Sequence, residues 1–313
     1  MDLRQTYIGV VLASALIVAF ESVAIEGALK IADLNIYLVS SLPSIIGGAI
    51  LLGLSPERSS RCVRELGARA WGNMTILCVI AAAGVFLWFD AVGRIGASKE
   101  AILGGGSSEV LFVVILSAVF LSERLRRWEI VGSILIVLGV FLVLANADSL
   151  SLGFGLGETE AILSSLLLAS SIVMVTALLR TNDLTALSGL ELLISGTMLI
   201  LFGSALGLIV WPDANGVLLL VALGAFPAVG LLTYNAGLPK IGASLTSVLF
   251  ALNGVITVGV QLLVLLIYPD ADIKLPNVLS LAILGGFVAF IGVYLINRRV
   301  PTIKAGRPTS EKL

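Results

Sequence analysis

Long runs of residues without a charged side chain constrain this chain more than any other feature of its sequence. Residues 8–20, 131–145 and 279–296 are three such runs. At about 1.5 Å of rise per residue, a helix of roughly 20 residues crosses the hydrocarbon core of a bilayer. Lipid offers no hydrogen-bonding partner to an unpaired amide, and the runs are too long and continuous for barrel strands of alternating polarity. The sequence therefore predicts an all-α integral membrane protein.

Apolar windows separated by charged or turn-forming residues predict ten transmembrane helices. They cover residues 7–29, 36–54, 70–91, 97–121, 128–145, 158–179, 184–210, 216–237, 242–268 and 278–296. The composition agrees, because 58% of the residues are hydrophobic and only 12% are charged, which leaves too little polar surface for a water-soluble domain. We expect the first run to be a membrane helix and not a cleaved signal peptide, because Glu21 and Glu26 lie near its far end.

The distribution of basic residues predicts the orientation in the membrane. With the N-terminus inside, 15 of the 19 lysine and arginine residues fall in inner segments, and only Lys30, Arg94, Lys99 and Lys274 fall in outer ones. The positive-inside rule then places both termini in the cytoplasm, as expected for a multi-pass protein of the cell (inner) membrane. The basic tail is expected to contact anionic membrane lipid. The net charge of -1 gives no reason to expect a nucleic-acid partner.

A short pattern occurs twice in the chain. Residues 88–98 read WFDAVGRIGAS and residues 234–244 read YNAGLPKIGAS, with a shared basic-IGAS core. Each copy lies between the third and fourth helices of a five-helix half, and an odd number of spans per half inverts the second half in the membrane. We therefore expect two inverted-topology five-helix repeats, over 1–147 and 148–299, followed by a tail at 300–313. Inverted repeats are typical of secondary transporters with a site near the midplane.

A longer motif lies between residues 109 and 140. Residues 109–112 read EVLF, 120–125 read FLSERL, 129–132 read EIVG and 138–140 read LGV. This stretch, with the aromatic-Ala-basic-IGA pattern before it, resembles the EPLF … LGERL … G … GV signature of the drug/metabolite transporter superfamily (DMT), in its ten-helix EamA branch. The resemblance implies a transporter, but members of this branch carry amino acids, purines, drugs and other metabolites.

The chain departs from this family pattern at three places. Val110 replaces the proline of the fourth helix, and the matching place in the ninth helix reads Asn253-Gly254. The second half also has Tyr268, Pro269 and Asp270 where an acidic-basic motif would follow its fourth helix. These departures leave room for a protein that kept the fold without the transport activity.

Glu109 is the first candidate for substrate binding. It lies about 12 residues into its predicted helix, near the bilayer midplane, where an ionised side chain costs at least about 2.5 kcal/mol. It either binds a cationic group or carries a proton, with Ser107 and Ser108 as partners, or it is a protonated acid bonded to a backbone carbonyl. The glycines at 104–106 either unwind the helix or allow close helix packing, and we favour packing.

The ninth predicted helix carries a polar stripe. Thr246, Asn253, Thr257 and Gln261 are spaced so that they lie on one face. Such a stripe either lines a pathway or forms hydrogen bonds between helices. Asn253 matches Glu109 in the repeat, and we favour the pathway.

Four other residues are candidates for a role in binding. Trp88 and Tyr234 occupy matching repeat positions and either stack on a substrate ring or anchor the interface. Glu21 and Glu191 lie deeper than the headgroups, and their roles stay open.

The remaining charged residues have simpler expected roles. Asp90 and Arg94 are predicted to form an ion pair at a helix end, and the cluster at 123–129 is predicted to be a cytoplasmic clamp. The other acidic residues near the predicted helix ends are expected to reach water, and these are Glu26, Glu100 and Glu160.

Missing residues exclude several classes of function. The chain has no histidine, which excludes histidine-based catalytic triads, HExxH zinc sites and haem ligation by imidazole. It also has no GxxxxGK[ST] phosphate loop. We therefore expect no enzymatic activity, no catalytic residue, no cofactor and no bound metal.

The leading hypothesis is a secondary active transporter that exports a small metabolite, such as an amino acid, nucleobase or drug-like compound, by alternating access. Proton coupling stays open. The alternative is a non-transporting membrane scaffold or sensor on the same fold. The expected partners are a small-molecule substrate and membrane lipid, and a homodimer stays open as well.

Overall fold

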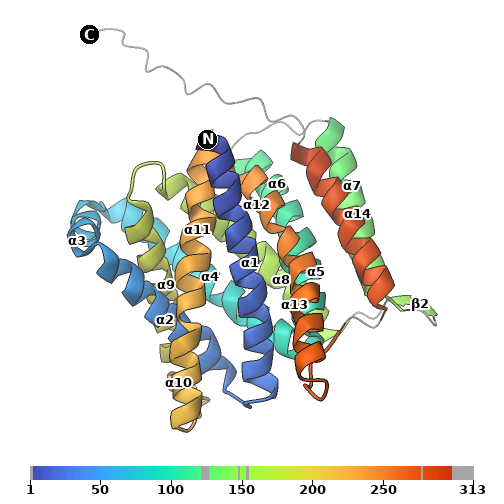
Figure 1. The fold of residues 1–313 in the computed structure, drawn as a ribbon. Coiled ribbons are helices and arrows are strands. Elements are labelled where there is room, and N and C mark those ends of the chain that lie inside the picture. The colour runs from blue at the N-terminus through green and yellow to red at the C-terminus, as the bar shows by residue number, and fades with distance from the viewer. Residues whose placement is uncertain (1–2, 121–126, 147–148, 153–154, 276–277, 298–313) are drawn as a thin grey trace.

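The computed structural model describes residues 3–120, 127–146, 149–152, 155–275 and 278–297. Helices dominate it and run side by side as a bundle (Figure 1). The helices are α1 (Leu3–Lys30), α2 (Ile36–Leu54), α3 (Pro56–Glu65), α4 (Ala68–Ile95), α5 (Ala97–Leu103), α6 (Glu109–Phe120), α7 (Arg127–Leu144), α8 (Leu156–Leu178), α9 (Leu184–Ala205), α10 (Ala214–Leu223), α11 (Ala225–Ile241), α12 (Ala243–Phe250), α13 (Leu252–Ile267) and α14 (Leu279–Asn297). A π-helical segment, η1 (Gly104–Ser108), joins α5 to α6, and the strands β1 (Ala145–Asn146) and β2 (Ser149–Leu152) form a small antiparallel pair after α7.

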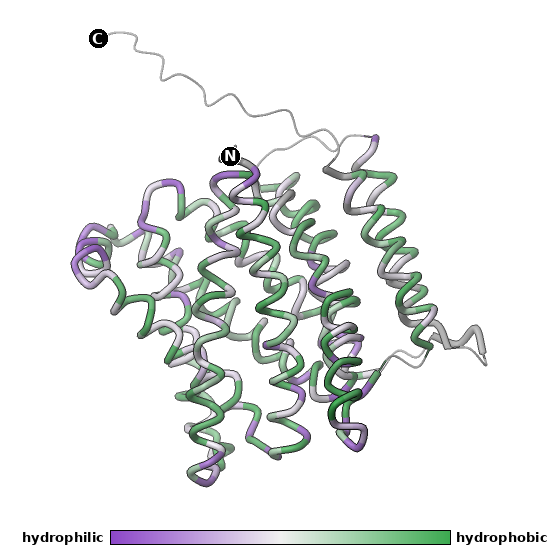
Figure 2. Tube along the Cα trace, viewed as in Figure 1, coloured by the Kyte–Doolittle hydropathy of each residue, from purple (hydrophilic) through white to green (hydrophobic). Residues whose placement is uncertain are grey.

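Eight helical stretches of the described chain are long and apolar enough to cross a membrane. They are Gln5–Lys30, Ile36–Leu54, Ala68–Ile95, Ala97–Phe120, Leu156–Leu178, Leu184–Ala205, Ala214–Ile241 and Thr246–Ile267. The helices α7 and α14 contain the shorter apolar stretches Ile130–Gly139 and Leu279–Gly292. Hydrophobic residues cover the long helices, and hydrophilic residues concentrate at the ends of the bundle and on α3 (Figure 2). The structure is that of a multi-pass membrane protein, as predicted.

Local sequence signals explain where several helices begin. Asn35 accepts a hydrogen bond from the Tyr37 amide before α2, and Asp183 accepts one from the Ala186 amide before α9. Such side-chain caps satisfy amides that the helix leaves without a partner. The two copies of the repeated pattern also form the same sharp turn, because Gly96 and Gly242 both have φ 89° and ψ 153°. Glycine adopts this positive φ without the clash that a Cβ would cause.

The segment after α2 is a helix, although it lies between the membrane helices predicted at 36–54 and 70–91. Helix α3 begins with Pro56, which is favoured in a first helical turn. Its buried face carries Ser59 and Cys62, three residues apart, while its arginines are exposed. This segment folds as a helix because a narrow buried stripe packs against the bundle, an arrangement that the density of charges had obscured.

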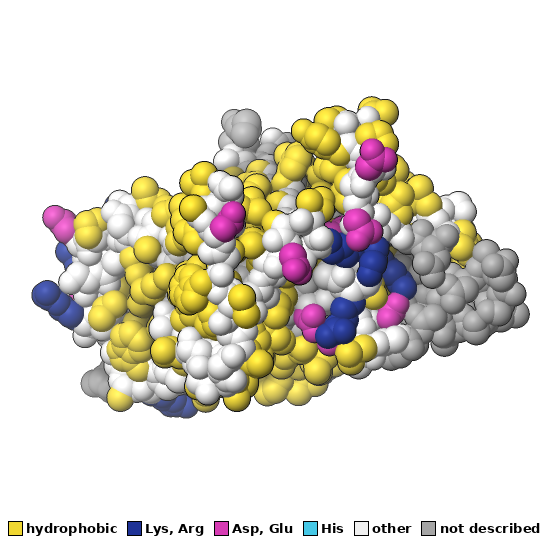
Figure 3. Space-filling view, turned by 90° about the horizontal axis from the view of Figure 1, so that it is seen from below, with side chains coloured by type: hydrophobic (Ala, Val, Ile, Leu, Met, Phe, Trp, Pro, Cys, Tyr) yellow, Lys and Arg dark blue, Asp and Glu magenta, His cyan; other side chains and the backbone are white. Residues whose placement is uncertain are grey.

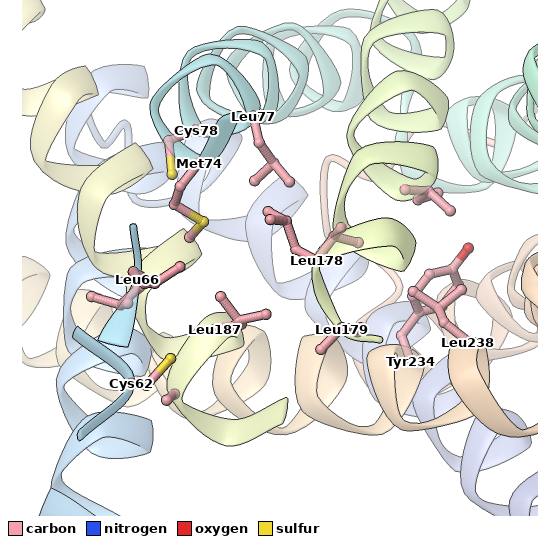
Figure 4. Packing of buried hydrophobic residues seen from close by; sticks show 14 of the residues in the cluster. Cys62, Leu66, Met74, Leu77, Cys78, Leu178, Leu179, Leu187, Tyr234 and Leu238 are labelled. Atoms are coloured by element: carbon pink, nitrogen blue, oxygen red, sulfur yellow. The ribbon is translucent and has the colours of Figure 1, made fainter. Parts of the chain in front are cut away.

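A large apolar cluster connects α3 to the bundle. Cys62 of α3, Met74 of α4, Leu178 of α8, Leu187 of α9 and Tyr234 of α11 all belong to it (Figure 4). The cluster therefore joins elements from both predicted halves of the chain.

Helices α7 and α14 form a separate pair at one edge of the bundle (Figure 1). A Cβ at Gly139 would lie 2.5 Å from the Gly285 carbonyl oxygen, and a Cβ at Gly292 would lie 2.5 Å from the Gly132 carbonyl oxygen. Glycine at these positions lets the two backbones approach closely, as is common in membranes.

Candidate functional site

A cavity of about 160 Å³ lies inside the bundle. Helices α1, α2, α4, α8, α9 and α11 contribute to its wall, together with the interrupted helices α5–η1–α6 and α12–α13. Its polar and aromatic lining consists of Ser14, Glu21, Ser44, Trp88, Phe89, Glu100, Glu109, Ser164, Ser165, Ser171, Glu191, Ser195, Tyr234, Asn235, Phe250 and Asn253. Both predicted halves of the chain therefore contribute to one cavity.

Five of the nine predicted site residues meet on the cavity wall. They are Glu21, Trp88, Glu109, Tyr234 and Asn253. Glu191, whose role the sequence left open, lines the cavity as well. The fold thus brings together residues that are far apart in the chain.

Four buried carboxyl groups face this cavity. The side chains of Glu21, Glu100, Glu109 and Glu191 are each 3–6% exposed. Within the described part of the chain, Glu21 and Glu109 form no side-chain hydrogen bond or ion pair, so the structure shows no bond from Glu109 to a backbone carbonyl there, which was one of the two alternatives for this residue. A carboxylate in apolar surroundings needs a proton or a positive partner.

Glu100 is a cavity residue that the sequence analysis placed in water. It is buried and accepts a hydrogen bond of 2.7 Å from the indole nitrogen of Trp88. The expectation was wrong because Glu100 lies only one turn into α5, and the position alone suggested a helix end at the membrane surface. The bond also orients Trp88, whose ring packs edge-on against Phe89 at a centroid distance of 4.8 Å.

Ser107 and Ser108 lie beside the cavity but not on its wall. Ser107 donates hydrogen bonds to the carbonyls of Ile102 and Leu103. These bonds satisfy backbone groups at the π-helical segment, where the regular hydrogen-bond pattern shifts. In this structure Ser107 therefore supports the interruption of the helix and does not bond to Glu109.

The three glycines of η1 lie in a π-helical turn and also allow close packing. A Cβ at Gly106 would lie 2.8 Å from the Ala101 carbonyl oxygen and 3.3 Å from that of Ala251. Gly105 lines the cavity, and its Cβ position lies 3.9 Å from the Asn253 amide nitrogen. Close packing is confirmed, and the helix is also interrupted here.

The four residues of the polar stripe on the ninth predicted helix have different surroundings. Asn253 lines the cavity, and Thr257 donates to its side-chain oxygen over 3.0 Å. Thr246 donates to the Gly242 carbonyl at the start of α12. Gln261 donates to Glu26 of α1. Only Asn253 of this stripe reaches the cavity, and the others form bonds within the protein.

Glu26 lies at the centre of a buried hydrogen-bond network. Its carboxylate, fully buried, accepts from Lys30 Nζ at 2.6 Å, from the Ala97 amide at 3.1 Å, from the Lys274 amide at 2.9 Å and from the Gln261 side chain. The expectation that Glu26 reaches water was wrong, because the start of α5 and the loop after α13 cover it. We call these five residues the Glu26 network.

Ion pairs surround the same end of the bundle. Lys99 of α5 pairs with Glu158 of α8. Arg94 contacts Asp90 and Glu160, each at 2.9 Å. The predicted pair of Asp90 and Arg94 is confirmed, while Glu160 is buried instead of reaching water. Figure 3 shows charged side chains of both signs gathered on this face.

Two predicted basic features cannot be placed. Most of the cluster at 123–129 and the whole tail at 300–313 lie outside the described residues. Their predicted roles stay predictions.

Comparisons with known proteins agree with the fold and the motif. A model of the EamA-like transporter family matches residues 5–145. No curated protein matches the chain. Among solved structures, 28 chains match, and one, titled "Crystal structure of protein", has a TM-score of 0.65 at 17% sequence identity and covers 96% of this chain and 99% of its own. At that identity the structural match shows the fold alone. The match over residues 5–145 is to a family of membrane transporters, and it agrees with the resemblance of the sequence motif to the EamA branch of the drug/metabolite transporter superfamily.

Proposed function

We propose that this protein is a secondary active transporter that exports a small metabolite by alternating access. The observation that carries the proposal is a cavity inside a multi-pass bundle, lined from both halves and containing four buried glutamates. Amino acids, nucleobases and drug-like compounds are the candidate substrates. The family consists of transporters, and no enzymatic activity is proposed.

The proposal includes ten membrane helices arranged as two inverted five-helix repeats, over 1–147 and 148–299. Helices α7 and α14 then cross the membrane as the fifth and tenth spans. The identical turns at Gly96 and Gly242 support this arrangement. The helix packing supports it as well. If each helix is replaced by its counterpart in the other half, the α4–α8 contact becomes the α11–α1 contact, and the α2–α9 and α7–α14 contacts remain the same pairs. Alternating access by rocking of two such halves is the common mechanism of this architecture.

The protein is proposed to lie in the cell (inner) membrane with both of its termini in the cytoplasm. Helix α3, which follows the second membrane helix, lies toward the end of the bundle where the chain begins (Figure 1). Its exposed arginines Arg58, Arg61 and Arg64 support a cytoplasmic position.

Glu109 is proposed to carry the proton that couples transport. Its buried carboxyl group has no hydrogen bond within the described residues, so it can exchange a proton with the cavity. Replacement of Glu109 by Gln should abolish movement driven by a proton gradient and leave counterflow exchange partly intact. The measurement is flux into proteoliposomes with and without an imposed pH gradient.

Glu57→Gln is the matched control for this test, because Glu57 is an exposed glutamate of α3 that does not line the cavity. It should transport like the original protein. Gradient-driven flux that is unchanged in Glu109→Gln would rule out the proposed role. No saturable flux of amino acids, nucleobases or drug-like compounds by folded protein would instead favour the scaffold or sensor.

A further inference from the structure

The charged side chains that line the cavity all have acidic groups, among the residues that the structure describes. Four glutamates line it, and no lysine or arginine of the described chain does. The four are Glu21 of α1, Glu100 of α5, Glu109 of α6 and Glu191 of α9. They come from both halves of the chain, so a ligand inside the cavity has carboxyl groups on several sides.

Glu191 carries the observation that points to a ligand. Its side chain is 6% exposed, and its Oε2 atom has no hydrogen-bond partner within the described residues. The side chain of Asn235, which donates to Ser188, also interacts with the Glu191 carboxyl group but leaves its Oε2 atom without a partner, and the hydroxyl of Ser195 donates to the Glu191 backbone carbonyl. A buried oxygen without a partner is costly and calls for a donor from outside the protein.

The rest of the wall is apolar and aromatic. Trp88, Phe89, Tyr234 and Phe250 contribute rings to it, and Tyr234 and Phe250 meet edge-on at a centroid distance of 5.0 Å. Aromatic faces attract cations, and they also pack against flat apolar groups. The wall therefore suits a positively charged head attached to an apolar or aromatic body.

We propose that the substrate class of this transporter is the small organic cation, an amine or ammonium compound with an apolar or aromatic body, and that Glu191 binds its positive head. The inference rests on the proposed transport function and deepens it. The size of the cavity fits a small ligand, because a void of about 150 Å³ is known to accommodate benzene. A metal ion is a poorer fit, because no group of three acidic, cysteine or histidine side chains among the described residues is arranged to hold one.

Three compounds with the same phenyl ring and different charges test the substrate class. They are benzyltrimethylammonium, a permanent cation, phenylalanine, a zwitterion, and phenylacetate, an anion. We expect saturable flux of the cation into proteoliposomes and binding of the cation to purified protein by calorimetry. The other two compounds should compete with it weakly or not at all.

Glu191→Gln tests the binding residue. A charge-assisted contact is worth enough that its loss should weaken binding of the cation by about tenfold to a hundredfold. Glu57→Gln is the control and should bind like the original protein. If Glu191→Gln does not fold, as judged by gel filtration and thermal melting, Glu21→Gln takes its place, with a weaker loss expected because Glu21 lies on the same wall.

The outcomes separate the inference from the proposed function. Saturable flux of phenylalanine or phenylacetate without that of the cation would overturn the inference and leave the transporter standing. Binding of the cation without flux would support the site and count against transport. Cation affinity that stays unchanged in Glu191→Gln, or no binding of the cation to folded protein, would overturn the inference.

Discussion

Several glutamate side chains are buried inside the helical bundle. Glu21, Glu109 and Glu191 were found from the sequence because each lies well inside a predicted apolar helix, where a charge needs a reason. Glu100 and Glu26 were missed. Both lie near predicted helix ends, where water is expected, and only the segments that pack over them exclude it.

Two glycines with the same backbone conformation allow a matched test of packing. An alanine at either Gly96 or Gly242 would adopt φ 89°, in a region that costs about 1–3 kcal/mol for a residue with a Cβ. At Gly96 the new Cβ would also meet the Lys274 carbonyl oxygen at 2.2 Å, whereas nothing lies within 4 Å at Gly242. Both variants should melt at a lower temperature in detergent, and Gly96→Ala should melt lowest. Equal melting temperatures would contradict the close contact with Lys274.

Glu26→Gln should destabilise the protein strongly. The neutral amide has no negative charge to pair with Lys30, and its NH₂ group replaces one of the two accepting oxygens, so either the bond from the Ala97 amide or the bond from the Lys274 amide is lost. Disruption of a buried ion pair of this kind costs about 3–5 kcal/mol. Unfolding followed by thermal melting should show a much larger loss than in Glu57→Gln, whose side chain is exposed. A loss no larger than that of the control would show that the Glu26 network contributes little.

Helix α3 shows the limits of prediction at the scale of elements. No helix is predicted for this charged segment, but its buried stripe packs against the bundle. Burial also raises the pKa of the Cys62 thiol, so this residue is a slow target for maleimide reagents.

Cysteine labelling should show that α3 is cytoplasmic. In a background where Cys62 and Cys78 are replaced by alanine, Ser60→Cys places an exposed thiol on α3, and Asn215→Cys places one at the start of α10. An impermeant maleimide should label Asn215→Cys in intact cells and Ser60→Cys only after the membrane is opened. The reversed pattern would show that the proposed orientation is wrong.

The two predicted halves of the molecule meet along several helix pairs, and α7 with α14 is the most separate of these pairs. Gly139→Val should weaken this pair, because its Cβ would clash with the backbone near Gly285 and Ala289. Overpacking of this kind costs about 1–3 kcal/mol. Gly259→Val is the matched control, since Gly259 has nothing within 4 Å of its Cβ position.

The measurement for this pair is the melting temperature together with flux. Gly139→Val should lower both if α7 and α14 act as one unit of the transporter. A Gly139→Val protein as stable as Gly259→Val would mean that the two helices do not depend on close contact.

The sequence by itself determined the class of the molecule, the approximate positions of its long apolar helices and its family motif. Lipid forces every span to be a long apolar helix, and that constraint can be read from consecutive residues. It did not determine which polar groups meet. Glu26 and Gln261 are 235 positions apart, and Glu191 meets Glu109 only across the cavity. In a membrane the side of a helix that faces lipid and the side that faces the protein are both apolar, so hydropathy alone does not reveal how each helix is rotated. Only the tertiary packing decided which carboxyl groups share one space.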